Sequence, residues 1–125
     1  GILMIAGKKL GAGRIFGVDT DPLAVTVAEK NLRLNHITDY GLAAGSLSRV
    51  QKGFDLVAAN ILSEVILALL PDIHRVLSPG GRFIGSGIIQ ENADAVIAGM
   101  ESLDFEILEV RAQEGWVAIC GRRGL

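Results

Sequence analysis

The sequence predicts an α/β fold, with a mostly parallel sheet and an antiparallel pair of strands at the carboxyl terminus. Three observations predict it. Short apolar segments alternate with segments of helical periodicity, turn residues separate the two kinds, and two apolar segments follow each other directly near the end of the chain. The chain has 125 residues, and 50% of them are hydrophobic. This size allows one ordinary core, and the apolar composition excludes a disordered chain.

Helices and strands are expected to alternate up to the last two strands. The helices are expected over residues 2–10, 22–35, 63–77 and 90–103. The strands are expected over residues 14–18, 40–43, 54–59, 82–86, 105–110 and 116–120. The short strand at 40–43 lies in the least regular part of the sequence.

Turn and capping residues mark the ends of the first elements. The segment Gly11-Ala12-Gly13 ends the first helix, and the strand that follows it leads into Asp19. Asp21 is expected to cap the second helix, with Pro22 in the first turn of that helix.

The second half of the chain contains the most apolar predicted strand. Residues 54–59 are almost uniformly apolar after Asp55, which is typical of a central parallel strand buried on both faces. Ser63 is expected to cap the next helix, whose apolar residues recur every three and four positions. Pro79-Gly80-Gly81 ends that helix and turns the chain into the next strand. A short polar stretch containing Gly115 separates the last two strands, which predicts a hairpin.

Charge, cysteine content and hydropathy exclude several classes of protein. The net charge is −2 and no basic cluster exceeds two adjacent residues, so no direct contact with nucleic acid is expected. Cys120 is the only cysteine, which excludes a disulfide framework and favours a reducing, cytoplasmic compartment. No apolar segment approaches the ~20 residues that cross a membrane. Neither histidine has a second ligand at metal spacing, so no metal site is predicted.

Asp19 is the first candidate binding residue, because ligands of open parallel sheets bind beyond the carboxyl ends of the strands. It stands at the end of the strand predicted over 14–18. A carboxylate at this place can accept hydrogen bonds from both hydroxyls of an adenosine ribose. The alternative is that Asp19 only stabilises the turn that follows the strand.

Asn60 is the second candidate, at the end of the strand predicted over 54–59. Its amide offers an acceptor and two donors, which suits it to orient an amine or the amino-acid part of a cofactor. A turn-forming asparagine is the alternative, since its side chain readily bonds nearby backbone. The turn Ser86-Gly87 stands at the corresponding place after the next predicted strand.

Several motifs follow one another in a fixed order along the chain. They are GIL at 1–3, LGA at 10–12, GVDTDPLAV at 17–25, FDLVAANIL at 54–62, LSPGG at 77–81, SGI at 86–88 and EGWVA at 114–118. In this order they resemble the PrmA family of S-adenosylmethionine-dependent methyltransferases, which modify the large-subunit ribosomal protein L-eleven. The resemblance spans nearly the whole chain. The Gly-Val-Asp-x-Asp-Pro segment occurs in many methyltransferases, whereas its combination with Ala-Asn-Ile-Leu is much more specific.

The resemblance implies a Rossmann-like, seven-stranded methyltransferase fold and assigns roles to four residues. It places Asp19 on the cofactor ribose and Asn60 beside the methionine end of S-adenosylmethionine and the incoming amine. It places Ser46 near the adenine, and Gly1 as the last glycine of the cofactor-binding loop. The implied reaction transfers a methyl group to lysine or amino-terminal amines of a ribosomal protein, with no need for a strong catalytic acid or base.

The resemblance also sets an expectation about what precedes Gly1. The family's first strand, its glycine loop and its domain that recognises the ribosomal protein are expected there, so residues 1–125 represent a partial methyltransferase domain. We expect these residues alone to bind S-adenosylmethionine weakly or not at all and to be inactive. An exposed sheet interior is expected to favour self-association.

Three other functions are compatible with parts of this sequence. A methyltransferase acting on a small molecule or nucleic acid would share the fold, although its Asn-Pro-Pro-Tyr segment is replaced by Asn60-Ile61-Leu62-Ser63. A non-catalytic α/β module would keep the fold without binding the cofactor. A nicotinamide-dependent dehydrogenase would need two βα halves, and this chain is too short for both.

Overall fold

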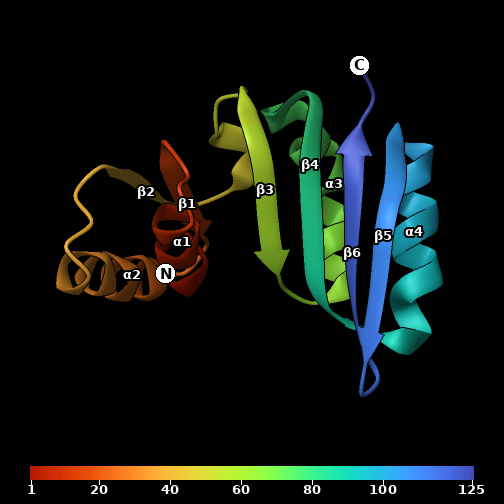
Figure 1. Cartoon of the computed structure of the whole chain (residues 1–125), viewed down its shortest axis with the longest axis horizontal. Helices are drawn as coiled ribbons and strands as arrows, with labels where there is room; N and C mark the ends of the chain where they lie inside the picture. Colours follow the sequence, from red (N-terminus) through yellow and green to blue (C-terminus); the bar gives the residue numbers. More distant parts are fainter. The chain divides into compact units, whose positions relative to one another are not determined.

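The computed structural model describes all 125 residues, which form two compact units (Figure 1). The first unit comprises Gly1–Arg49 and the second comprises Val50–Leu125. The helices and strands alternate as the sequence predicts, and six strands are present. No helix has the length and apolar character needed to cross a membrane.

The first unit is a small parallel sheet packed with helices. In chain order its elements are α1 (Ile2–Lys9), β1 (Ile15–Asp19), α2 (Pro22–Leu34), β2 (Tyr40–Ala44) and the 3-10 helix η1 (Leu47–Arg49). Strands β1 and β2 pair in parallel, from Ile15 opposite Tyr40 to Asp19 opposite Ala44. The buried residues Ile15, Leu32 and Ile37 form its core, against which Met4, Ile5, Tyr40 and Leu42 pack. The strand predicted at 40–43 is therefore confirmed.

The amino-terminal end of α2 is fixed by the capping residue that the sequence predicts. Asp21 has an extended backbone, and its Oδ1 accepts a hydrogen bond from the backbone N–H of Leu23 at 2.9 Å. Pro22 occupies the first position of the helix, where its missing N–H leaves no intrahelical bond unmade. The cap and the proline together explain why the helix begins at this point.

We expect the variant Asp21→Ala to lose about 1 kcal/mol of folding free energy, because the N–H of Leu23 loses its side-chain acceptor. Chemical denaturation measures the loss, and Asp21→Ser, which retains a capping oxygen, is expected to recover most of it. Equal stability of the alanine variant and the natural chain would contradict this assignment of the cap.

The second unit is a four-stranded sheet with two helices. Its elements are β3 (Phe54–Asn60), α3 (Ser63–Val76), β4 (Leu77–Ile89), the 3-10 helix η2 (Gln90–Asn92), α4 (Ala93–Ser102), β5 (Phe105–Gln113) and β6 (Trp116–Arg123). The strand order is β3-β4-β6-β5, with β3 parallel to β4 and the other pairs antiparallel. Both helices lie on the same side of this sheet (Figure 1). The closing hairpin of β5 and β6 is confirmed and is longer than predicted.

The core of the second unit lies between the sheet and its two helices. Its fully buried side chains come from α3, β4, α4 and β6, and the largest are Phe83, Ile66, Leu70, Ile73, Leu77, Ile88, Met100 and Ile119. Most of the apolar positions that the helical periodicity predicts for α3 and α4 lie in this core.

The prediction that residues 54–59 form a central strand buried on both faces is wrong for this sheet. Strand β3 pairs with β4 alone and lies at the sheet edge. Ala59 is paired with Gly85, and a side chain at Gly85 would point at Ile66 of α3, so the Ala59 face is the covered one. Leu56 faces the other way and is 53% exposed. An apolar composition indicates that a strand is at least partly buried, but it does not reveal how many strands pair with it.

Two further sequence predictions about this unit need correction. Ser63 is the first residue of α3 and makes no side-chain cap, because Leu62 takes the capping position. Pro79-Gly80-Gly81 lies inside β4 and does not separate helix from strand: the partner of β3 jumps from Leu77 to Arg82, so the residues between them form a bulge. Gly80 permits this bulge with a φ of 81°.

Candidate functional site

Asp19 lies at the carboxyl end of β1 and is exposed. Its Oδ1 accepts a hydrogen bond from the backbone N–H of Asp21 at 2.9 Å, and its own carbonyl accepts one from Gly45 at 2.9 Å. The first bond orients the carboxylate across the turn between β1 and α2. The second carboxylate oxygen, Oδ2, accepts no hydrogen bond from the chain, so the group can receive hydroxyl donors from a ligand.

Ser46 lies near Asp19 in the pairing of β1 with β2. Asp19 pairs with Ala44, and Ser46 follows two residues later at the same edge of the sheet. Its Oγ accepts hydrogen bonds from the N–H of Ser48 at 3.2 Å and from the Ser48 hydroxyl at 2.9 Å. The Ser46 oxygen therefore supports the turn into η1, while its own proton is free to be donated. The structure brings these two predicted residues to one edge.

Gly1 occupies the capping position of α1, and its carbonyl accepts a hydrogen bond from the N–H of Ile5 at 3.1 Å. A side-chain carbon built at Gly1 would lie 3.1 Å from Cα and 3.2 Å from Cβ of Ala28 in α2. Close packing of the two helices thus accounts for a glycine here. The predicted cofactor role of Gly1 remains a prediction.

Asn60 is the last residue of β3 and pairs with Ser86 at the end of β4. Its side chain is exposed, and no hydrogen bond within the chain engages its amide. One acceptor and two donors are therefore available at the carboxyl end of this sheet. Gly87, with a φ of 75°, follows Ser86, and a side-chain carbon built at Gly87 would overlap with the Asn60 amide oxygen. Asn60 belongs to the second unit, whereas Asp19, Ser46 and Gly1 belong to the first.

A hydrogen bond that the sequence did not predict joins two helices of the second unit near Asn60. Asn92 donates from Nδ2 to Oγ of Ser63 at 2.8 Å, and Ser63 is only 6% exposed. The bond ties the start of α3, shortly after Asn60, to the end of η2. A serine after a strand looks like a helix cap in sequence, and its partner 29 positions away gives no local signal.

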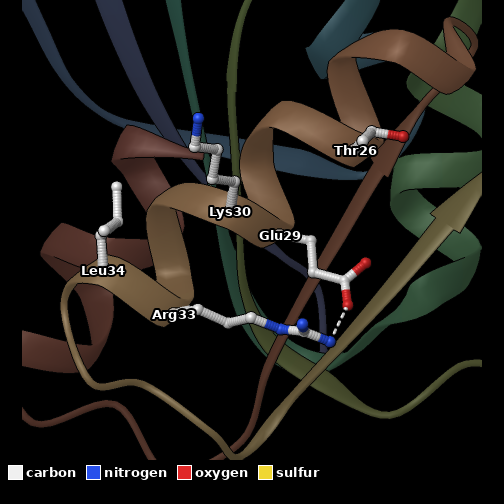
Figure 2. Close-up of a pocket in the computed structure, with 5 residues that line it drawn as sticks. All are labelled: Thr26, Glu29, Lys30, Arg33 and Leu34. Atoms are coloured by element: carbon white, nitrogen blue, oxygen red, sulfur yellow. Dashed lines mark hydrogen bonds and ion pairs between the residues drawn. The ribbon is translucent and has the colours of Figure 1, made fainter.

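Two open hollows on the surface contain none of the predicted site residues. One, of about 410 Å³, lies along the outer surface of α2 and is lined by Thr26, Glu29, Lys30, Arg33 and Leu34. Figure 2 shows that an ion pair crosses it, with Nη2 of Arg33 2.6 Å from Oε1 of Glu29. A hydrogen bond with Tyr40 and the charge of Glu29 raise the pKa of Arg33, so this side chain stays cationic. The other hollow lies beside the carboxyl terminus.

The fold is that of the S-adenosylmethionine-dependent methyltransferases, as three solved structures indicate. A ribosomal protein L11 methylase from Lactobacillus delbrueckii subsp. bulgaricus is 34% identical with a TM-score of 0.95, over 99% of this chain and 65% of that one. A methyltransferase from Pyrococcus furiosus, 15% identical, has a TM-score of 0.86 over 99% and 70% of the two chains. An RNA methyltransferase from Salinibacter ruber, solved with S-adenosyl-L-homocysteine, is 18% identical with a TM-score of 0.77 over 99% and 74%. The last two share the fold alone.

The chain belongs to the PrmA family, because the family model for ribosomal protein L11 methyltransferase matches residues 1–124. Curated relatives named ribosomal protein L11 methyltransferase agree with this. The relative from Desulfosudis oleivorans is 45% identical over 98% of this chain, and the one from Dictyoglomus thermophilum is 40% identical over 98%. The chain spans 42% and 40% of these two relatives, or about two fifths of their length.

Proposed function

We propose that this chain is part of a methyltransferase that transfers a methyl group from S-adenosylmethionine to lysine or amino-terminal amines of a large-subunit ribosomal protein. The match of the family model to residues 1–124 carries this proposal. The available carboxylate oxygen of Asp19 and the unengaged amide of Asn60 support it, since both groups stand at carboxyl ends of parallel strands. The expected cytoplasmic location is part of the same proposal.

The residues of the first unit fit the adenosine part of the cofactor. Asp19 is fixed by the N–H of Asp21 and retains acceptor capacity for two ribose hydroxyls. Ser46 stands at the same edge with a hydroxyl proton to donate toward the base. We propose that Gly1 adds contact at the start of α1, where backbone N–H groups favour a carboxylate.

S-adenosylmethionine, when bound, supplies an activated methyl group that needs no further electrophilic assistance. The task left to the protein is to hold an uncharged nitrogen in line with that group. In our proposal the Asn60 amide oxygen accepts a hydrogen bond from the incoming amine and thereby orients the nitrogen lone pair.

A transfer assay tests the proposed function. The full-length protein is incubated with S-adenosylmethionine carrying a labelled methyl group and with unmodified ribosomal protein L11. We expect label to be incorporated at lysine or amino-terminal nitrogen, located by mass spectrometry of the digested substrate. Label on ribosomal RNA or on a small molecule, with none on protein, would contradict the proposal and favour the alternative substrate classes.

A further inference from the structure

We infer that Asn92 is a positioning residue, which holds the loop that follows Asn60 through a hydrogen bond to Ser63. The loop is the two-residue connection of Ile61 and Leu62 between β3 and α3. Nδ2 of Asn92 donates to Oγ of Ser63 at 2.8 Å, across 29 positions of the chain. The catalytic meaning of this contact rests on the proposed function, whereas the contact itself is a feature of the structure.

Ser63 needs a hydrogen-bond partner because it is buried. It is 6% exposed and is the only polar residue among the buried residues of the chain. A buried hydroxyl without a partner is costly, so the bond from Asn92 favours one arrangement of the first turn of α3. In that turn the N–H groups of Val65 and Ile66 both donate to the carbonyl of Leu62 at 3.0 Å. The end of the loop and the start of the helix are thus fixed together.

Neither partner has the role that its residue type usually has at a helix start. Asn92 stands at the capping position of α4 but makes no side-chain cap, and α3 also lacks one. Asparagine and serine are favoured caps because a side-chain oxygen can accept a hydrogen bond from an N–H group of the first turn. Here the two side chains bond to each other, so the contact joins two helix starts and caps neither of them.

The hydrogen bond acts at the end of the loop that strand pairing does not reach. Asn60 is the last residue of β3 and pairs with Ser86, which fixes the near end of the loop. The side chain of Leu62 is 64% exposed and contributes little packing at the far end. The first fully buried side chain of α3 is Ile66, three positions beyond Ser63. The bond to Ser63 therefore holds the chain between the sheet and the first core residue of the helix.

Asn92 is itself anchored to the rest of the second unit. The 3-10 helix η2, which ends at Asn92, begins with a hydrogen bond from the N–H of Gln90 to the carbonyl of Gly115 in the closing hairpin, at 2.9 Å. Without the bond to Ser63, the first turn of α3 can fray and the loop gains freedom directly after Asn60. An amine oriented by Asn60 would then be held less well in line, so transfer would slow even with the cofactor bound.

Thermal unfolding and hydrogen exchange of the full-length protein test the contact. Asn92→Ala and Ser63→Ala are each expected to lower the melting temperature by about 3 °C, which is the effect of one hydrogen bond. The double variant is expected to lose no more than the larger single loss, because either change alone removes the bond. Exchange of the N–H groups of Val65 and Ile66 is expected to quicken about fivefold in Asn92→Ala. In Asn92→Asp a carboxylate can accept from the Ser63 hydroxyl, so natural exchange rates are expected.

The catalytic readout needs a control of similar stability. Ile73→Val removes a methyl group from a side chain that is 1% exposed in the same helix, ten positions beyond Ser63, and is also expected to lower the melting temperature by about 3 °C. We expect Asn92→Ala to lower kcat about fivefold while the cofactor dissociation constant changes less than about twofold. Asn92→Asp is expected to restore kcat, and Ile73→Val to leave it within about twofold of the natural value.

Three results would overturn the inference: additive thermal losses in the double variant, unchanged exchange in Asn92→Ala, or a kcat of Asn92→Ala equal to that of Ile73→Val. If Asn92→Ala does not fold, the exchange rates and kcat of Ser63→Ala decide in its place, because that variant removes the same bond. Absence of methyl transfer by the natural protein would defeat the proposed function. The thermal cycle and the exchange rates would still decide whether Asn92 holds the loop.

Discussion

The variant Asp19→Ala is expected to bind S-adenosylmethionine about 30- to 100-fold more weakly than the natural full-length protein. Hydrogen bonds to a charged group contribute about 1.5–3 kcal/mol each, and a tenfold change in affinity corresponds to about 1.4 kcal/mol. A loss of 30- to 100-fold corresponds to about 2–2.8 kcal/mol, which is within the contribution of one such bond to the ribose. Isothermal titration of the purified protein with the cofactor measures the effect.

A neighbouring carboxylate provides the control for Asp19. Asp21 is two residues away and is also exposed, but its Oδ1 caps α2. We expect Asp21→Ala to bind the cofactor within about threefold of the natural affinity, despite its lower stability. The conservative variant Asp19→Asn keeps one acceptor oxygen and should fall between the two. Undiminished affinity in Asp19→Ala would leave Asp19 with its turn hydrogen bond to Asp21 as its only role.

Much of the first unit could be predicted from sequence because its determinants are local. The cap at Asp21 and the proline after it define the start of α2 within three residues, and the structure confirms both. The end of β1 at Asp19 follows from the same turn. Ser46 could be placed only roughly, since its position depends on the pairing of β1 with β2.

The errors in the second unit concern properties that local sequence does not contain. The apolar strand at 54–59 indicated a buried centre, but the number of neighbouring strands is set by the sheet order, and β3 has one partner. Pro79 and glycines beside it signal a chain break equally well in a turn and in a bulge inside a strand. Serine is a residue type that often caps helices, but the hydroxyl of Ser63 accepts a hydrogen bond from the amide of Asn92 instead.

The candidate site also combines features that local sequence predicts with features that depend on strand pairing. Parallel strands place polar residues at their carboxyl ends, so Asp19 and Asn60 could be singled out without coordinates. The approach of the Gly87 backbone to the Asn60 side chain could not be predicted, because it depends on the pairing of Asn60 with Ser86 and on the irregular pairing that follows. Sequence thus predicted which groups are available, and the structure was needed to show which backbone segments lie beside them.

The largest effect on turnover is expected from Asn60→Ala, which should lower kcat for methyl transfer at least about 100-fold while changing cofactor affinity less than about fivefold. The amide makes no hydrogen bond within the chain, so its loss removes little folding energy. It does remove the acceptor that orients the amine, and misalignment of a reacting group by about 1 Å can cost about 100-fold in rate. Single-turnover kinetics with labelled cofactor measure the change.

Two companion variants show whether the amide acts on the amine. Asn35→Ala removes an exposed amide that caps the end of α2, where its Nδ2 donates to Asn31, and is expected to leave turnover within twofold. Asn60→Asp keeps an acceptor but adds a negative charge, which favours the charged form of the incoming amine and raises its pKa. Its pH-rate profile is therefore expected to shift to higher pH relative to the natural protein. An unshifted profile, or full turnover in Asn60→Ala, would show that Asn60 does not contact the amine.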